Sequence, residues 1–118
     1  MTTVLVIDDD QIIVDLLKMV VEDAGHEVVI ASAMDRIPQP LSPDLILTDL
    51  IPLKSYRRDL AQEWIRDLRS RYPRIPIVVV TAHAEAARDA GQLGADAIVE
   101  KPFDVEILGA RIAELLSR

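Results

Sequence analysis

Short apolar runs recur along this chain at fairly regular intervals. Residues 4–7, 45–47 and 77–80 consist only of Val, Leu and Ile. Continuous aliphatic runs without alternating polar positions are typical of strands buried on both faces of a parallel sheet. The segments 28–31 and 97–100, which are apolar except for Glu100, predict two further strands. The pattern therefore predicts a five-stranded parallel sheet.

Helical periodicity fills most of the gaps between these runs. Apolar positions recur every three or four residues within 12–21, 60–72 and 108–116, as on the buried face of an amphipathic helix. Asp10 and Asp104 stand where a side chain can cap the first and the last of these segments. Each segment therefore predicts a helix.

Two connections are predicted to be less regular. Prolines 38, 40 and 43 leave room for only one or two helical turns near residues 33–37, because proline in a helix interior removes a hydrogen bond. Residues 85–93 predict a fourth helix that is rich in alanine and weakly anchored. Together the elements predict a single (βα)5 domain over residues 1–118, with helices on both faces of the sheet.

Composition narrows the classes of function. The chain has 118 residues and a net charge of −7, which argues against nucleic-acid binding. No apolar run approaches the ~20 residues of a membrane-spanning helix, and no signal-peptide pattern opens the chain. The chain has no cysteine, which excludes disulfides and thiolate metal sites. We therefore expect a cytoplasmic protein that does not bind a membrane.

Polar side chains follow several predicted strands at the point where each strand ends. Asp8, Asp9, Asp49, Thr81 and Lys101 all occupy such positions. The carboxyl ends of parallel strands share one edge, where open α/β sheets bind ligands. Carboxylates ~4 Å apart repel by about 4 kcal/mol at an effective dielectric near 20 unless a cation intervenes. Mg²⁺ prefers oxygen ligands and keeps water positions that a phosphoryl oxygen can take, so the set predicts a magnesium-assisted phosphoryl site.

The positions of these residues suggest separate roles. Carboxylates can attack phosphorus and form acyl phosphates. Asp49 has no acidic neighbour in sequence, so it is the predicted phosphoryl acceptor. The adjacent pair Asp8 and Asp9 are predicted metal ligands. Thr81 and Lys101 are predicted to contact the phosphoryl group as charge develops on its oxygens.

Five short motifs occur in a fixed order along nearly the whole length of the chain. They are residues 4–9, 43–49, 77–82, 94–97 and Lys101-Pro102-Phe103. Together they resemble the receiver domain of two-component response regulators. The resemblance implies a flavodoxin-like sheet in the order 2-1-3-4-5 and a cis bond before Pro102. It also implies that Asp8, Asp9, Asp49 and the backbone carbonyl of Ile51 hold Mg²⁺.

The resemblance further implies a signalling role. Asp49 would receive a phosphoryl group from a sensor histidine kinase or a histidine phosphotransfer protein. The domain would not be an enzyme in the usual sense, but a phospho-acceptor that assists its own phosphorylation and dephosphorylation. A change in the surface formed by residues 85–93, 97–100 and the last helix would then reach a downstream effector protein or domain. Formation of a homodimer is left open.

Two departures from the receiver pattern support a first alternative. Pro52 stands one place earlier than the usual loop proline, and the polar residues 54–58 replace a glycine-bearing turn. Ile98 stands where receivers usually carry an aromatic switch residue. The chain could therefore be a degenerate receiver that binds a protein without phosphorylation.

A second alternative is a small haloacid-dehalogenase-like phosphatase that uses Asp8. The pattern Asp8-x-Asp10 after a strand, with Thr81 and Lys101 after later strands, imitates the motifs of that class. However, the chain beyond Pro102 lacks the expected acidic pair, and the sequence has no cap insertion.

Overall fold

Five parallel strands form the centre of the molecule in the order β2-β1-β3-β4-β5. The computed structural model describes residues 2–51 and 53–117. The strands are β1 (Thr3–Ile7), β2 (Glu27–Ala31), β3 (Leu45–Thr48), β4 (Ile77–Thr81) and β5 (Ala97–Glu100). Number, direction and order agree with the flavodoxin-like fold that the sequence predicted.

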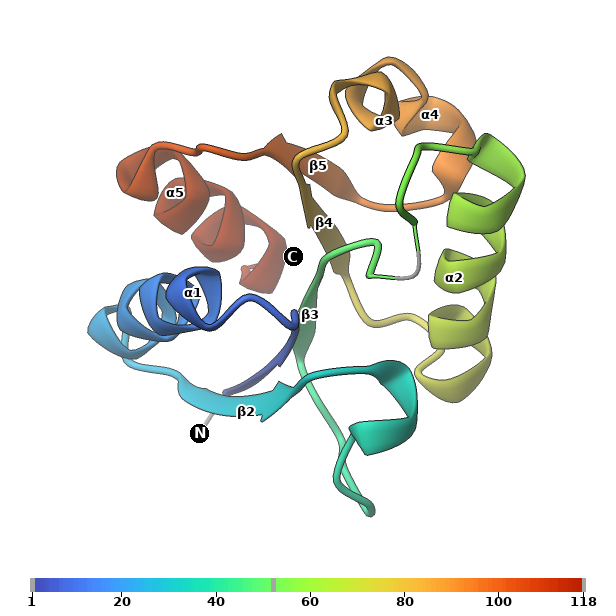
Figure 1. Cartoon of the computed structure of the whole chain (residues 1–118). Helices are drawn as coiled ribbons and strands as arrows, with labels where there is room; N and C mark the ends of the chain where they lie inside the picture. Colours follow the sequence, from blue (N-terminus) through green and yellow to red (C-terminus); the bar gives the residue numbers. More distant parts are fainter. Residues whose placement is uncertain (1, 52, 118) are drawn as a thin grey trace.

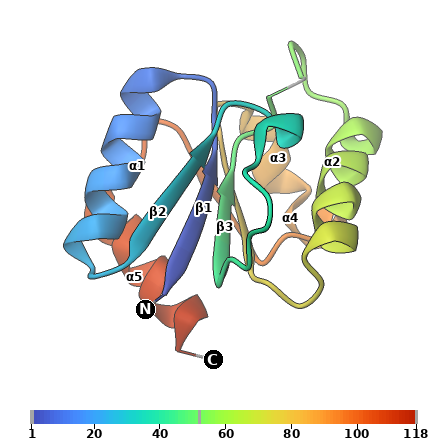
Figure 2. The ribbon, with the colours of Figure 1, turned by 90° about the horizontal axis from the view of Figure 1, so that it is seen from below.

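Helices cover both faces of this sheet. They are α1 (Gln11–Asp23), α2 (Arg58–Arg71), α3 (Ala84–Arg88), α4 (Ala90–Leu93) and α5 (Val105–Leu116), with a 3-10 turn η1 at Met34–Arg36. α1 and α5 lie on one face, and α2, α3 and α4 lie on the other (Figures 1 and 2). The expected short helical turn near residues 33–37 is therefore confirmed as η1.

The predicted helix caps are present. Oδ1 of Asp10 accepts a hydrogen bond from the N–H of Ile12 at 3.0 Å. Oδ1 of Asp104 accepts from the N–H groups of Glu106 and Ile107 at 2.8 and 3.3 Å. These bonds satisfy first-turn amides that have no partner within their own helix, so α1 and α5 begin where the sequence predicted.

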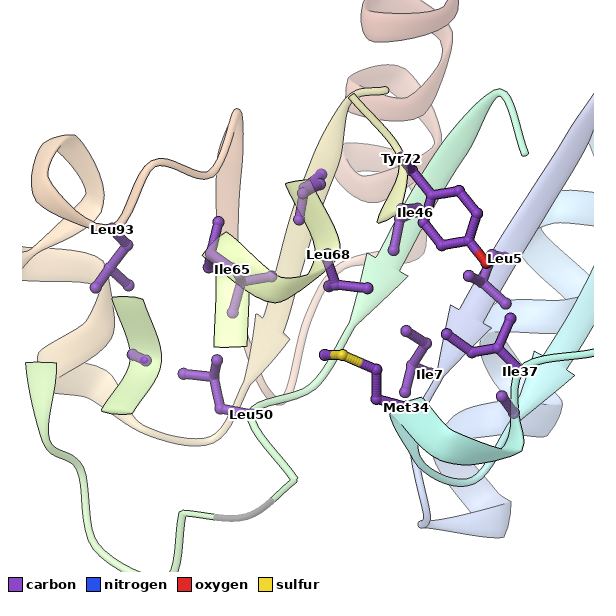
Figure 3. Close-up of a cluster of buried hydrophobic side chains, with 14 of the residues drawn as sticks. Leu5, Ile7, Met34, Ile37, Ile46, Leu50, Ile65, Leu68, Tyr72 and Leu93 are labelled. Atoms are coloured by element: carbon purple, nitrogen blue, oxygen red, sulfur yellow. The ribbon is translucent and has the colours of Figure 1, made fainter. Parts of the chain in front are cut away.

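Each face of the sheet contributes to its own apolar layer. Along β1, Val4 and Val6 face the layer under α1 and α5, whereas Leu5 and Ile7 face the layer under α2, because successive strand residues point to opposite faces. All four side chains are fully buried, as continuous aliphatic runs predicted. Figure 3 shows the α2 layer, with labelled side chains that include Leu5, Ile7, Met34, Ile46, Leu50, Ile65 and Leu68.

The prediction of a single helix over residues 85–93 is wrong. The structure has two short helices, α3 and α4, which are separated at Asp89. Asp89 has φ −97° and ψ 12°, outside regular helical geometry, and its carboxylate is bound by the side chains of Tyr56 and Arg58. Within the described segment 84–93, only Ala86 and Leu93 are buried, which agrees with the weak anchoring that the composition predicted.

Three local features bear on the remaining sequence predictions. The peptide bond before Pro102 is cis, as the receiver pattern implied. Pro52, which stands one place earlier than the usual loop proline, lies outside the described residues. Across residues 2–51 and 53–117, none of the helices is both long and apolar enough to span a bilayer.

Candidate functional site

Backbone hydrogen bonds align the strand ends that carry the predicted site residues. The N–H of Asp49 donates to the carbonyl of Ile7, the last residue of β1, at 2.8 Å. The N–H of Lys101 donates to the carbonyl of Thr81, the last residue of β4, also at 2.8 Å. Residues that follow neighbouring strands are therefore held level with one another at the carboxyl edge of the sheet.

Three of the predicted residues form a carboxylate cluster at this edge. One carboxylate oxygen from each of Asp8, Asp9 and Asp49 lies within 4.8 Å of the other two. Asp8 is only 2 % exposed, Asp49 is partly buried and Asp9 is exposed. Exposure to solvent therefore increases across the cluster from Asp8 through Asp49 to Asp9.

Lys101 joins two members of the cluster. Its Nζ lies 3.0 Å from Oδ2 of Asp8 and 3.3 Å from Oδ2 of Asp49. The remaining oxygens of these carboxylates bind backbone amides: Oδ1 of Asp8 accepts from Asp10 at 2.9 Å, and Oδ1 of Asp49 accepts from Leu50 at 2.8 Å. Both carboxylates thus have fixed orientations, with one oxygen each directed toward the ammonium group.

Burial and charge act in opposite directions on the ionisation of this site. Burial raises the pKa of Asp8 above 3.8, and the negative charge of Asp49 adds to this, although hydrogen bonds from Asp10 and Lys101 partly offset it. Burial alone lowers the pKa of Lys101, but the hydrogen bond to Asp8 and the negative charges of Asp49 and Asp8 outweigh it, so its pKa lies above 10.5. A further positive charge would therefore be favourable beside Asp8.

The donor set fits a hard divalent cation. Three carboxylates share the edge with Lys101, so their ionised forms carry more charge than one ammonium group balances. Oxygen ligands of this kind suit Mg²⁺ better than a thiophilic metal. The chemistry of the cluster therefore agrees with the predicted metal.

Thr81 is fully buried at the end of β4. Its Oγ1 accepts a hydrogen bond from the backbone N–H of His83 at 3.1 Å, and its carbonyl accepts from Lys101. Its place beside Lys101 is as the sequence predicted, and its contact with a phosphoryl group stays a prediction.

The two hydrophobic positions of interest lie on the same side of the sheet. Ile51 and Ile98 are partly buried and pack against the layer under α2. The role of the Ile51 carbonyl in metal binding stays a prediction. In the segment after Thr81, the ring of His83 lies near that of Tyr56, with a distance of 6.2 Å between the ring centroids.

Sequence reasoning missed two groups of side-chain contacts made by Tyr56 and by residues of α2. Tyr56 Oη and Arg58 donate to the carboxylate of Asp89 at 2.6 and 2.9 Å. The indole N–H of Trp64 donates to Oγ1 of Thr48 at 2.9 Å. The partners are 33, 31 and 16 residues apart in sequence, so no local pattern could have paired them.

Comparison with known proteins decides the family. A sequence model described as the response regulator receiver domain matches residues 4–113. The chain belongs to this receiver domain family. Receiver domains generally bind Mg²⁺ at an acidic pocket, act as phospho-acceptors rather than enzymes, and partner with histidine kinases and effector domains.

Curated relatives support the same assignment. The chain is 38 % identical to "DNA-binding dual master transcriptional regulator RpaA" of Synechocystis sp. and 35 % identical to "KDP operon transcriptional regulatory protein KdpE" of Escherichia coli. Each alignment covers 100 % of this chain, but only 50 % and 52 % of those proteins. This receiver therefore spans about half the length of these relatives.

Solved structures agree in fold. A response regulator receiver domain protein from Clostridium thermocellum aligns with a TM-score of 0.77 and 26 % identity, covering 100 % of this chain and 96 % of the other. A response regulator from Thermotoga maritima aligns with a TM-score of 0.80 at 21 % identity, covering 99 % and 98 %. The match of the receiver model to residues 4–113 favours the receiver interpretation over the phosphatase alternative.

Proposed function

We propose that residues 1–118 form one phospho-acceptor domain that switches a signalling output in the cytoplasm. A sensor histidine kinase or a histidine phosphotransfer protein donates the phosphoryl group, and Asp49 accepts it. The observation that carries this proposal is the position of the Asp49 carboxylate, which lies 3.3 Å from the Lys101 ammonium and in one cluster with the carboxylates of Asp8 and Asp9. A nucleophile, a cation and a metal-binding pair are thus within reach of one phosphoryl group.

Each side chain has a part in the transfer. Asp8, Asp9, Asp49 and the carbonyl of Ile51 hold Mg²⁺, which, when bound, neutralises charge on the phosphoryl oxygens. Lys101 directs its ammonium group to an oxygen of the bound phosphoryl group. Thr81 provides a hydroxyl to another. A carboxylate oxygen of Asp49 forms the bond to phosphorus while the bond to the leaving group of the donor breaks.

In this proposal, the same residues assist both the phosphorylation and the dephosphorylation of the domain. Groups that stabilise charge during attack by Asp49 also stabilise it during attack by water on the acyl phosphate. The domain is consumed as an acceptor in the first step and regenerated in the second. It therefore differs from an enzyme that turns over a separate substrate.

The output surface is formed by the segment α3–α4 together with β5 and α5. The segment follows Thr81 directly and has little apolar anchoring, so binding of Thr81 to the phosphoryl group can shift the population of its conformations. A downstream effector protein or domain reads this change. The net charge of −7 makes this domain itself a poor ligand for nucleic acid.

Phosphoryl incorporation tests the proposal. The protein is incubated with acetyl phosphate and Mg²⁺, and the modified residue is located by mass spectrometry of peptides. The wild type should carry one phosphoryl group on Asp49, which Asp49→Ala should lose. Asp59→Ala, which removes an exposed aspartate on α2, should keep it as a control. Unmodified wild-type protein that still binds a partner would instead support the degenerate receiver.

A further inference from the structure

The peptide group after the acceptor is hydrogen-bonded at both of its polar atoms. The carbonyl oxygen of Asp49 accepts a hydrogen bond from Oγ1 of Thr48 at 2.8 Å. The N–H of Leu50 donates to Oδ1 of Asp49 at 2.8 Å. Because a peptide group is planar, the direction of its carbonyl also sets the direction of its N–H. The Thr48 hydroxyl therefore influences the bond that orients the acceptor carboxylate.

Thr48 is in turn held by α2. The indole Nε1–H of Trp64 donates to Oγ1 of Thr48 at 2.9 Å. An indole N–H can only donate, so it occupies an acceptor position of Oγ1 and leaves the single hydroxyl proton for the carbonyl of Asp49. Thr48 is 1 % exposed, and bulk water does not compete for this hydroxyl. Three hydrogen bonds thus form a continuous relay from Trp64 to the carboxylate of Asp49.

Packing fixes both ends of this relay. Trp64 is partly buried against the apolar layer under α2. Leu50 is 2 % exposed and belongs to the same layer, as Figure 3 shows. Neither the indole nor the Asp49–Leu50 peptide can turn without disturbing that layer. The relay therefore leaves Oδ2 of Asp49 facing Lys101.

We propose that Trp64 and Thr48 are positioning residues for phosphoryl transfer to Asp49. This inference rests on the proposed function and adds two residues to it. In the transfer, an oxygen of the Asp49 carboxylate bonds to phosphorus, the bond from phosphorus to the donor oxygen breaks, and acetate leaves acetyl phosphate with that electron pair. A misplacement of about 1 Å can slow such a step by up to ~10²-fold. Loosening the relay should slow transfer more than it weakens Mg²⁺ binding, because Asp49 is the only one of the proposed metal-binding carboxylates that the relay orients.

Initial rates of phosphoryl incorporation test this inference. Rates are measured over a range of acetyl phosphate concentrations at saturating Mg²⁺, at a temperature where each variant is folded by circular dichroism. Trp64→Phe and Thr48→Val should each lower the maximum rate by about threefold to tenfold, with a smaller change in the Kd for Mg²⁺. The double variant should be no slower than Thr48→Val, because both changes break one relay. Thr48→Ser retains the hydroxyl and should stay within about twofold of the wild type.

Tyr72→Phe is the matched control. It removes a polar group from another aromatic residue of the same layer, whose hydroxyl accepts a hydrogen bond from Gln39 at 3.2 Å, and it should leave the maximum rate unchanged. Wild-type rates in Trp64→Phe and Thr48→Val would overturn this inference but not the proposed function. An equal decrease in the rate of Tyr72→Phe would do the same. Absence of incorporation in the wild type would refute the proposed function, and this inference with it.

Discussion

Asp8 is the residue at which burial and charge oppose each other most directly. Burial raises its pKa above 3.8 in the folded protein, so the native state binds a proton at Asp8 more readily than the unfolded chain does. Stability from this group therefore falls as the pH rises through its folded pKa. At neutral pH, its ionised form destabilises the metal-free protein.

Replacement of Asp8 tests this balance. Asp8→Asn removes the buried charge and keeps one acceptor oxygen, for either Lys101 or the N–H of Asp10. Since burial of the charge is the largest effect on the pKa of Asp8, the variant should raise the thermal midpoint of the metal-free protein at neutral pH. Mg²⁺ at 100 times its Kd should stabilise the wild type by about 2.7 kcal/mol and Asp8→Asn much less. Thermal unfolding with and without Mg²⁺ measures both effects. A variant that is less stable without metal, yet equally stabilised by it, would contradict this role of Asp8.

At the level of elements, the most informative feature is the connection between the loop after β3 and the junction of α3 and α4. Tyr56 and Arg58 both bind Asp89, and the side chain of Gln62 donates to the carbonyl of Gln92 at 2.9 Å. The hydrogen bonds from Arg58 and Tyr56 lower the pKa of Asp89, whereas burial, together with the bond to Asp89, raises the pKa of Tyr56. The polar residues that replace the usual glycine-bearing turn therefore hold a segment with few buried apolar groups.

Amide hydrogen exchange tests this interpretation. Asp89→Asn should speed exchange across residues 84–93, because it weakens the bonds from both Tyr56 and Arg58. Gln92→Ala removes an exposed side chain from α4 and should have a smaller effect. In the wild type, Mg²⁺ with beryllofluoride, an acyl-phosphate mimic, should change exchange in this segment. Equal exchange rates in all these samples would contradict a role of residues 84–93 in the switch.

At the level of the whole molecule, the sequence predicted the strands and helix starts, which depend on local residue patterns. The aliphatic runs of β1, β3 and β4 predicted buried parallel strands, and Asp10 and Asp104 predicted two helix starts. Because parallel strands end at one edge, the close approach of the three carboxylates also followed from the sequence.

The remaining features depend on contacts between distant residues. Asp89, where α3 and α4 are separated, is bound by side chains 31 and 33 residues earlier, and the relay from Trp64 joins a helix to a strand end. Neither has a periodic or adjacent signal. Residue spacing therefore predicts which groups meet at the sheet edge, but not how surrounding elements orient them.

A crystal structure of the protein with Mg²⁺ and beryllofluoride would show whether the sheet edge holds a phosphoryl group as proposed. We expect beryllofluoride on the carboxylate of Asp49, in contact with Lys101 and Thr81, and Mg²⁺ coordinated at the cluster of Asp8, Asp9 and Asp49. Density for beryllofluoride elsewhere, or carboxylates that turn away from one another with Mg²⁺ absent from the cluster, would contradict the proposed site.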